Sequence, residues 1–240
     1  MDYLLFVVIP YASLAIFLIG SIYRYKNRPF TVSSLSSQFL EGKKPFLPSQ
    51  FFHWGLFILF FGHLIAFLFP ASVLLWDGHP VRLLILEITA FVFGLSAFIG
   101  LMLLIYRRLT VRRVQMVTNR MDFVVFIILM VQIISGLVVA YTNRWGSAWF
   151  AAFLTPYLRS IFVFDPQIDA ISSVVSLSLR IHVVAAFSLI GIIPFTRFMH
   201  FLVYPLDYTW RSYQQVVWNW NRKRIRVSKA HRAGPKSTNN

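Results

Sequence analysis

Four histidines are the residues of this 240-residue chain whose type and spacing suggest chemistry. His53 and His63 lie ten residues apart in the uncharged stretch 51–69, and His182 and His200 lie eighteen apart in a later apolar stretch. A polar ring inside a membrane costs several kcal/mol unless it finds a partner. Histidines in such stretches therefore predict a functional site.

The ligand chemistry open to these histidines is narrow. The chain has no cysteine, which excludes disulfides, iron–sulfur ligation, thiol chemistry and covalent attachment of a c-type haem. Zinc would need a third ligand, and neither histidine-bearing stretch contains Asp or Glu. A b-type haem needs two axial nitrogens, an apolar slot and counterions for its propionates. We predict two b haems; histidines hydrogen-bonded to serines or carbonyls stay the alternative.

The elements that must position the histidines are predicted to be membrane helices. Hydrophobic residues make up 58% of the chain and charged residues 13%. Since a bilayer core about 30 Å thick needs roughly 20 apolar residues, each long apolar run can span it. The predicted fold is an all-α integral membrane bundle of five transmembrane helices, formed by 3–22, 51–69, 83–106, 121–141 and 174–204.

The connections carry further expectations. The segment 70–81 is predicted to be a loop, because it contains Asp77-Gly78-His79-Pro80. The segment 148–164 is apolar but broken by Pro156 and Arg159, which predicts an interfacial element lying on the surface and able to cap a pocket.

The last run, 174–204, is longer than a span needs, so this helix should tilt or protrude. The predicted domains are a membrane domain, 1–210, and a basic cytoplasmic tail, 211–240.

Positive charge indicates the orientation. Lys and Arg number eighteen in 24–50, 107–120 and the tail, against three in the connections on the other side. By the positive-inside rule the amino terminus is outside and the carboxyl terminus cytoplasmic, in a multi-pass protein of the cytoplasmic membrane. The net charge of +15 therefore reflects topology, and we expect no nucleic-acid partner.

This topology sorts the histidines by depth. His63 and His182 lie toward the outside and form the outer pair. His53 and His200 lie toward the cytoplasm and form the inner pair. On one continuous helix, eighteen residues make five whole turns, so His182 and His200 would share a face about 27 Å apart.

Charged and small residues near the histidines have predicted roles. Arg180 and Arg197 precede the two later histidines and could pair with haem propionates, as could Arg113. Snorkelling to the interface is the alternative for the first two arginines, and a topogenic role for the third. Gly55 and Gly62 leave room for a flat ligand or for a close helix contact.

With these residues in place, the chain resembles the gamma subunit of respiratory nitrate reductase over about residues 3–205. The histidine spacings match that family, whereas the tail beyond 210 is longer and more basic than expected. The motifs that carry the resemblance are Ser36-Ser37-Gln38, Phe52-His53-x-Gly55, Phe60-x-Gly62-His63, Arg180-x-His182 and Pro194-Phe195-x-Arg197-x-x-His200.

The resemblance implies a dihaem cytochrome b that anchors a cytoplasmic iron–sulfur subunit and a molybdenum catalytic subunit. It implies a quinol site by the outer haem, at Gly62 and a lysine for which this chain has Arg82. Arginine can donate to a quinol oxygen but does not give up its proton. Glu87 or His79 could take quinol protons, and an ion pair with Arg82 is the alternative for Glu87.

The expected function is quinol oxidation near the outer face, with electrons passing through both haems to the iron–sulfur partner of a nitrate reductase-type complex. Three alternatives remain. One is an equivalent haem subunit of a related quinone-linked complex, in sulfur metabolism or nitrite oxidation. The others are a non-haem transporter with histidines in a proton path and a haem-free assembly anchor.

Overall fold

The computed structural model describes residues 1–27, 46–143, 145–169 and 176–203, and every regular element in these ranges is a helix. Five of the described helical segments are long and apolar enough to cross a membrane: Leu4–Asn27, Leu47–Leu68, Pro80–Thr110, Arg120–Thr142 and Leu177–Phe195. The predicted all-α, five-span fold is confirmed. Which side of a membrane each end faces stays a prediction.

The chain divides into a unit Met1–Val203 and a unit Tyr204–Asn240. The second unit, and with it the predicted tail 211–240, lies outside the described residues. The motif Ser36-Ser37-Gln38 lies outside them too.

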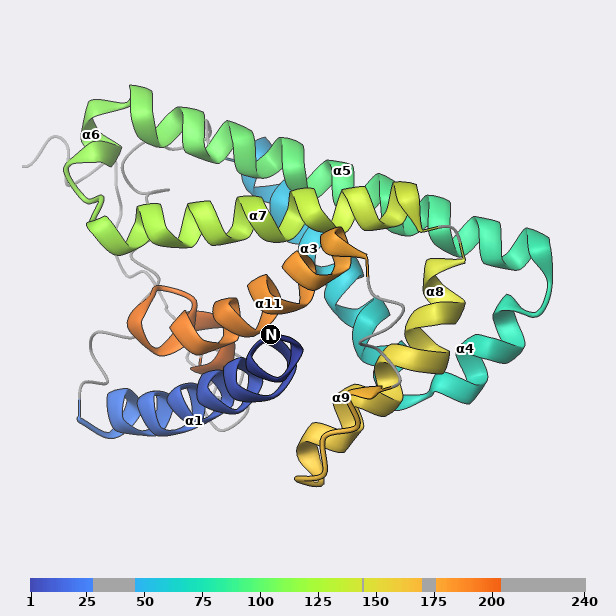
Figure 1. Cartoon of the computed structure of the whole chain (residues 1–240). Helices are drawn as coiled ribbons and strands as arrows, with labels where there is room; N and C mark the ends of the chain where they lie inside the picture. Colours follow the sequence, from blue (N-terminus) through green and yellow to red (C-terminus); the bar gives the residue numbers. More distant parts are fainter. Residues whose placement is uncertain (28–45, 144, 170–175, 204–240) are drawn as a thin grey trace, which may run out of the picture. The chain divides into compact units, whose positions relative to one another are not determined.

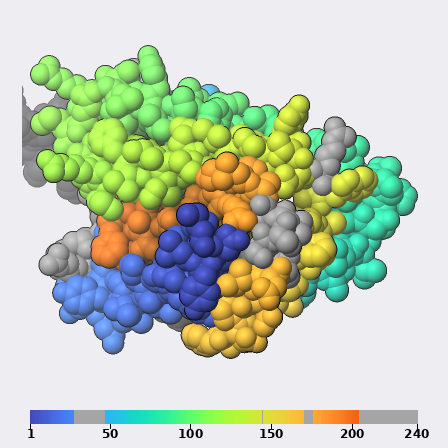
Figure 2. Space-filling model, viewed as in Figure 1, coloured from blue at the N-terminus to red at the C-terminus, as the bar shows by residue number. Residues whose placement is uncertain are grey.

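The long helices of the first unit pack in a consistent order. A short π-helix, η1 (Leu4–Val8), leads into α1 (Ile9–Asn27). α3 (Phe46–Leu68) packs mainly on α5 (Pro80–Thr110), and α5 runs beside α7 (Arg120–Thr142) (Figure 1). α11 (Leu177–Ile192) packs on α7 and α1, and the side chains of these three helices meet on one face (Figure 2). The two histidine-bearing helices therefore have different principal neighbours.

Glycine sets the close approach of α3 to α5. A Cβ on Gly55 would lie 2.6 Å from the Ala97 nitrogen and 2.7 Å from the Phe93 oxygen. Gly100 lies against the Phe52 backbone in the same contact. Only residues without a side chain let two helix backbones approach this closely. Gly55 is thus a helix contact, which decides between the two roles considered for it.

The connection 70–81 is mainly helical, so the predicted loop is wrong. α4 (Pro70–Asp77) begins with a proline, whose fixed φ suits the first helical position. Phe69, with φ −126° and ψ 58°, separates it from α3. The turn residues act only at the end of α4, where the chain turns at Gly78 into α5.

The predicted interfacial element is also helical, but it is not merely on the surface. It comprises α8 (Gly146–Trp149), the π-helix η3 (Phe150–Leu154) and α9 (Thr155–Phe162). Tyr157 and Ile161 are each 1% exposed and belong to a core cluster with Phe6. The Tyr157 hydroxyl donates to the Phe6 carbonyl at 2.7 Å. One side of the element is therefore part of the protein core.

The last predicted helix is not continuous. α11 ends at Ile192, a 3₁₀ turn, η4 (Ile193–Phe195), follows, and Thr196 is extended. Pro194 has no N–H to donate, which favours a break there. Arg24 of α1 donates to the carbonyls of Pro194 and Thr196 at 2.6 and 2.7 Å, which stabilises the broken end.

His200 lies in a separate helical turn beyond this break. The prediction that His182 and His200 share one face of one helix is therefore wrong. Residues 174, 175 and 204, at the ends of the predicted helix, lie outside the described ranges.

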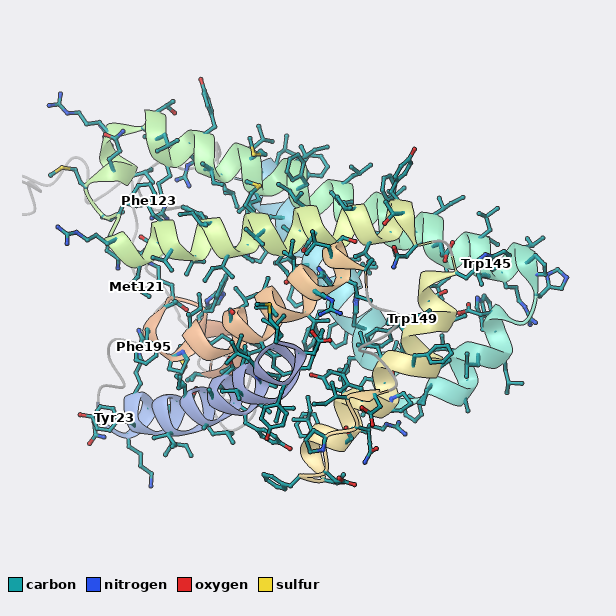
Figure 3. All side chains as sticks on the ribbon, viewed as in Figure 1. Tyr23, Met121, Phe123, Trp145, Trp149 and Phe195 are labelled. Carbon is teal, nitrogen blue, oxygen red and sulfur yellow. The ribbon has the colours of Figure 1, made fainter. Side chains whose placement is uncertain are left out.

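Six labelled side chains mark the two ends of the bundle. Met121, Phe123, Tyr23 and Phe195 lie toward one end, and Trp145 and Trp149 lie toward the other (Figure 3). The end with Met121 also carries the arginines of the α5–α7 connection, which are Arg107, Arg108, Arg112, Arg113 and Arg120. This is the end for which the charge count predicts a cytoplasmic position.

Candidate functional site: two histidine pairs

The outer pair is in contact. The ring centres of His63, on α3, and His182, on α11, lie 6.5 Å apart with the planes tilted by 39°. A metal–imidazole bond is about 2 Å long, so two imidazoles on opposite sides of one metal ion have ring centres roughly 6 Å apart. The observed centre-to-centre separation is close to this value.

All four histidine rings share one hydrogen-bonding pattern. A carbonyl oxygen only accepts, so the ring nitrogen that faces one must carry the hydrogen. In a neutral ring the other nitrogen, Nε2, then has the lone pair that binds a metal. The Nδ1–carbonyl distances are 2.7 Å from His53 to Ser49, 2.7 Å from His63 to Leu59, 3.0 Å from His182 to Gln132 and 2.6 Å from His200 to Arg197.

The outer ligand on α11 lies in a cradle formed by α7. The Gln132 carbonyl and the Ser135 hydroxyl lie 3.0 and 3.1 Å from His182 Nδ1. The Gln132 side-chain amide lies 3.2 Å from His182 Nε2, so binding iron there would exchange this hydrogen bond for a metal bond. A Cβ on Gly136 would lie 2.8 Å from His182 Cε1. Sequence analysis missed this cradle, whose signal is the small Ser135-Gly136 pair within a span.

The other ring of the outer pair is more open. His63 is exposed, with the ring of Phe150 from η3 edge-on at 5.3 Å. The segment predicted to cap a pocket therefore does contact a predicted ligand. A Cβ on Gly62 would meet nothing within 4 Å, so there is space for a group beside His63.

The inner pair consists of one exposed and one half-buried ring. His53 lies in the first turns of α3, where the Ser49 hydroxyl is also 3.1 Å from Nδ1. His200 follows the break in α11. Among the contacts described for these two residues, none joins one ring to the other.

Known proteins resemble this chain over most of its length. The family model of the nitrate reductase gamma subunit matches residues 2–219. The chain belongs to this family.

Individual relatives agree. The nitrate reductase gamma chain of Bacillus subtilis is 31% identical over 210 residues, which are 86% of this chain and 93% of that protein. The respiratory nitrate reductase 1 gamma chain of Escherichia coli is 30% identical over 88% of this chain and 95% of its own length. The nitrate reductase-like protein NarX of Mycobacterium tuberculosis is 30% identical over 89% of this chain but only 33% of its own length. The gamma-subunit resemblance is confirmed, and the residue roles stay predictions.

The three arginines predicted to meet propionates lie in different surroundings in this gamma-subunit relative. Arg180 forms an ion pair with Asp2, and its guanidinium lies 5.8 Å from the Phe6 ring centre. The hydrogen bond that Arg180 donates to the Asp2 carboxylate holds the pKa of Asp2 below its ordinary value. Arg197 contacts Asp122 at 3.0 Å, and Arg113 is exposed.

No hydrogen bond or ion pair joins the predicted quinol residues to one another within the described ranges. Arg82 lies over the Trp76 ring at 5.5 Å and donates to the Leu75 carbonyl at 3.4 Å. The described contacts of Arg82 do not include Gly62. A Glu87 carboxylate oxygen accepts from the Gly146 N–H at 2.8 Å, and no Arg82–Glu87 ion pair is found within the described ranges.

Proposed function

We propose that this gamma-subunit relative binds two b haems and conducts electrons from membrane quinol to an iron–sulfur partner. The observation that carries the proposal is the shared hydrogen bonding of the four histidines. Each donates its Nδ1–H to a backbone carbonyl and so presents Nε2 as a ligand. This tautomer leaves Nε2 with the lone pair that haem iron requires.

The outer haem would be held by His63 and His182, and the inner haem by His53 and His200. A bound haem iron would supply reversible one-electron transfer. Gln132 and Ser135 of α7 fix the ring of His182 through Nδ1. Ligation there requires the Gln132 amide to turn away from Nε2.

Quinol would bind on the outer side, in the space beside Gly62. Arg82 is at the same end of the bundle and can donate hydrogen bonds to a quinol oxygen. Because its guanidinium stays protonated, a different group must receive the quinol protons. We propose two acceptors for these protons. One is the exposed His79, between α4 and α5, and the other is Glu87, near the start of α5.

The proposed partners are an iron–sulfur subunit and a molybdenum catalytic subunit. Curated relatives of comparable length are named as gamma chains of nitrate reductases, which supports this assignment. The arginine-rich end formed by α6 (Arg112–Gln115) and its flanks is the proposed cytoplasmic side. The chain is proposed to lie in the cytoplasmic membrane.

The test replaces one histidine at a time in the full chain and measures redox titrations of the b-type optical bands. His63→Ala and His182→Ala should remove the same titrating step, and His53→Ala and His200→Ala the other. His79→Ala, an exposed histidine outside both pairs, controls for the substitution itself and should retain both haems. Loss of the same haem in His53→Ala and His63→Ala would refute the pairing.

A further inference from the structure

A buried ion network joins α7 to the segment that carries the inner ligand His200. Asp122 contacts Arg108 of α5 at 2.7 Å through Oδ2 and Arg197 at 3.0 Å through Oδ1. The side chains of Asp122, Arg108 and Arg197 are only 9%, 14% and 24% exposed. One carboxylate therefore holds two guanidinium groups, one on each oxygen.

The carboxylate itself is fixed to the start of α7. The Asn119 side chain accepts from the Asp122 N–H at 2.8 Å, and Asp122 Oδ2 accepts from the Asn119 N–H at 3.1 Å. This reciprocal arrangement is a capping box, which sets both the start of the helix and the position of the carboxylate. Asp122 is thus a rigid anchor for what binds to it.

The path from this anchor to His200 is short. Arg197 also donates to the Val117 carbonyl at 2.6 Å, so its side chain bridges to the α5–α7 connection. Its own backbone carbonyl accepts from His200 Nδ1 at 2.6 Å and from the His200 N–H at 3.2 Å. The residue held by Asp122 is therefore the residue whose carbonyl orients the ring of His200.

The break in α11 leaves His200 outside the backbone ladder of that helix. A continuous helix would hold His200 through its backbone ladder, but Thr196 is extended. Arg24 holds the carbonyls on one side of the segment, at Pro194 and Thr196. Asp122 holds the other side through Arg197.

We propose that Asp122 is a positioning residue for His200, acting through Arg197, so that α7 orients both ligands contributed by the last membrane segment. Gln132 and Ser135 orient His182 from the same helix. The inference rests on the proposed function, because it assigns Asp122 to the geometry of the inner haem. In this proposal Arg197 positions the ring of His200 and does not pair with a haem propionate.

Asp122→Asn separates charge from size. An asparagine keeps the shape but has one acceptor oxygen and an amide that turns N–H groups toward a guanidinium. Both guanidinium groups then lose their ion pair with residue 122, while Arg197 retains its hydrogen bond to the Val117 carbonyl. Without this ion pair, the Arg197 backbone carbonyl shifts and the His200 ring follows.

The test is a redox titration of the full-length chain with optical and electron paramagnetic resonance detection. Asp122→Asn should shift the potential and resonance signal of the inner haem, or remove that haem, and leave the outer haem unchanged. Asp122→Glu, which restores the charge, should recover the inner signal. Arg108→Gln is the matched control, because it disrupts the same network without touching Arg197, and it should retain both haems.

An inner haem unchanged in Asp122→Asn would overturn the inference. Equal loss of both haems in Asp122→Asn and Arg108→Gln would overturn it too, since the network would then serve only the fold. A wild-type chain without haem would refute the proposed function instead, so the two failures are distinguishable.

Discussion

Gly136→Ala tests whether α7 sets the position of the outer ligand. An added Cβ would lie 2.8 Å from His182 Cε1 and 3.3 Å from Nδ1. Carbon atoms in good contact are about 3.5–4.0 Å apart, so the ring and the methyl group must separate by roughly 1 Å. His182 cannot move that far without stretching its hydrogen bonds to Gln132 and Ser135.

The magnitude follows from the packing. Inserting a methyl group into a tight contact typically costs about 1–3 kcal/mol. A displacement of the His182 ring by roughly 1 Å should also weaken or abolish iron ligation, because sites depend on positions held to about 0.5 Å. We therefore expect a weakened or absent outer haem together with a modest loss of stability.

The assay combines thermal unfolding in detergent with a redox titration of the b-type bands. Gly94→Ala is a matched control, because its Cβ would lie 2.9 Å from Leu137 Cδ2, the end of a flexible side chain on α7. It adds a methyl group to the packing of the same helix without touching a histidine. Gly94→Ala should keep both haems; a normal outer haem in Gly136→Ala would refute the reasoning.

Three further predictions concern other parts of the chain. Tyr157→Phe should lower the unfolding free energy by about 1–3 kcal/mol, measured by denaturation in detergent, because the buried Phe6 carbonyl loses its donor; an unchanged stability would contradict the packed position of α9. Asp2→Asn should lower the melting temperature near neutral pH, because the Arg180 hydrogen bond lowers the folded-state pKa of Asp2. The difference from the wild type should shrink as the pH falls below the ordinary pKa of 3.8, and a constant difference across that range would contradict this role of Asp2. Arg82→Ala should weaken inhibition by quinol analogues and retain both haems, and an unchanged response would remove Arg82 from the quinol site.

The spans and the position of histidines within them could be predicted because their signals are local. A long uncharged stretch must be helical in lipid, and two histidines in it stand out against apolar neighbours. The outer pair was predicted from the topology of the spans. This topology could be derived because a single spanning segment must be helical, since strands or irregular backbone would leave polar groups unpaired in lipid. The contact between His63 and His182 agrees with the depth argument.

The break in α11 was missed although Pro194 was visible in the sequence. Proline is tolerated within membrane helices when neighbours satisfy the freed backbone groups, so its presence does not decide between a kink and a break. Here Arg24, 170 residues away in the chain, donates a hydrogen bond to the Pro194 carbonyl. Such a long-range donor leaves no local signal, so the sequence predicted one continuous helix where the structure has a break.

The supporting residues of the site were missed for a similar reason. Asn119-x-x-Asp122 is a recognisable helix-start pattern, and it correctly marks the beginning of α7. Nothing in that pattern shows that Asp122 also binds Arg197 of the last membrane segment. The predicted propionate arginine thus proved to have a protein carboxylate beside it.

The measurement that tests the central claim most directly is the haem content of the purified full chain after growth with sufficient haem. A pyridine haemochrome assay against protein concentration should give two b haems per chain, with a reduced-minus-oxidised spectrum of b type. A colourless protein that retains its helical fold would contradict the account.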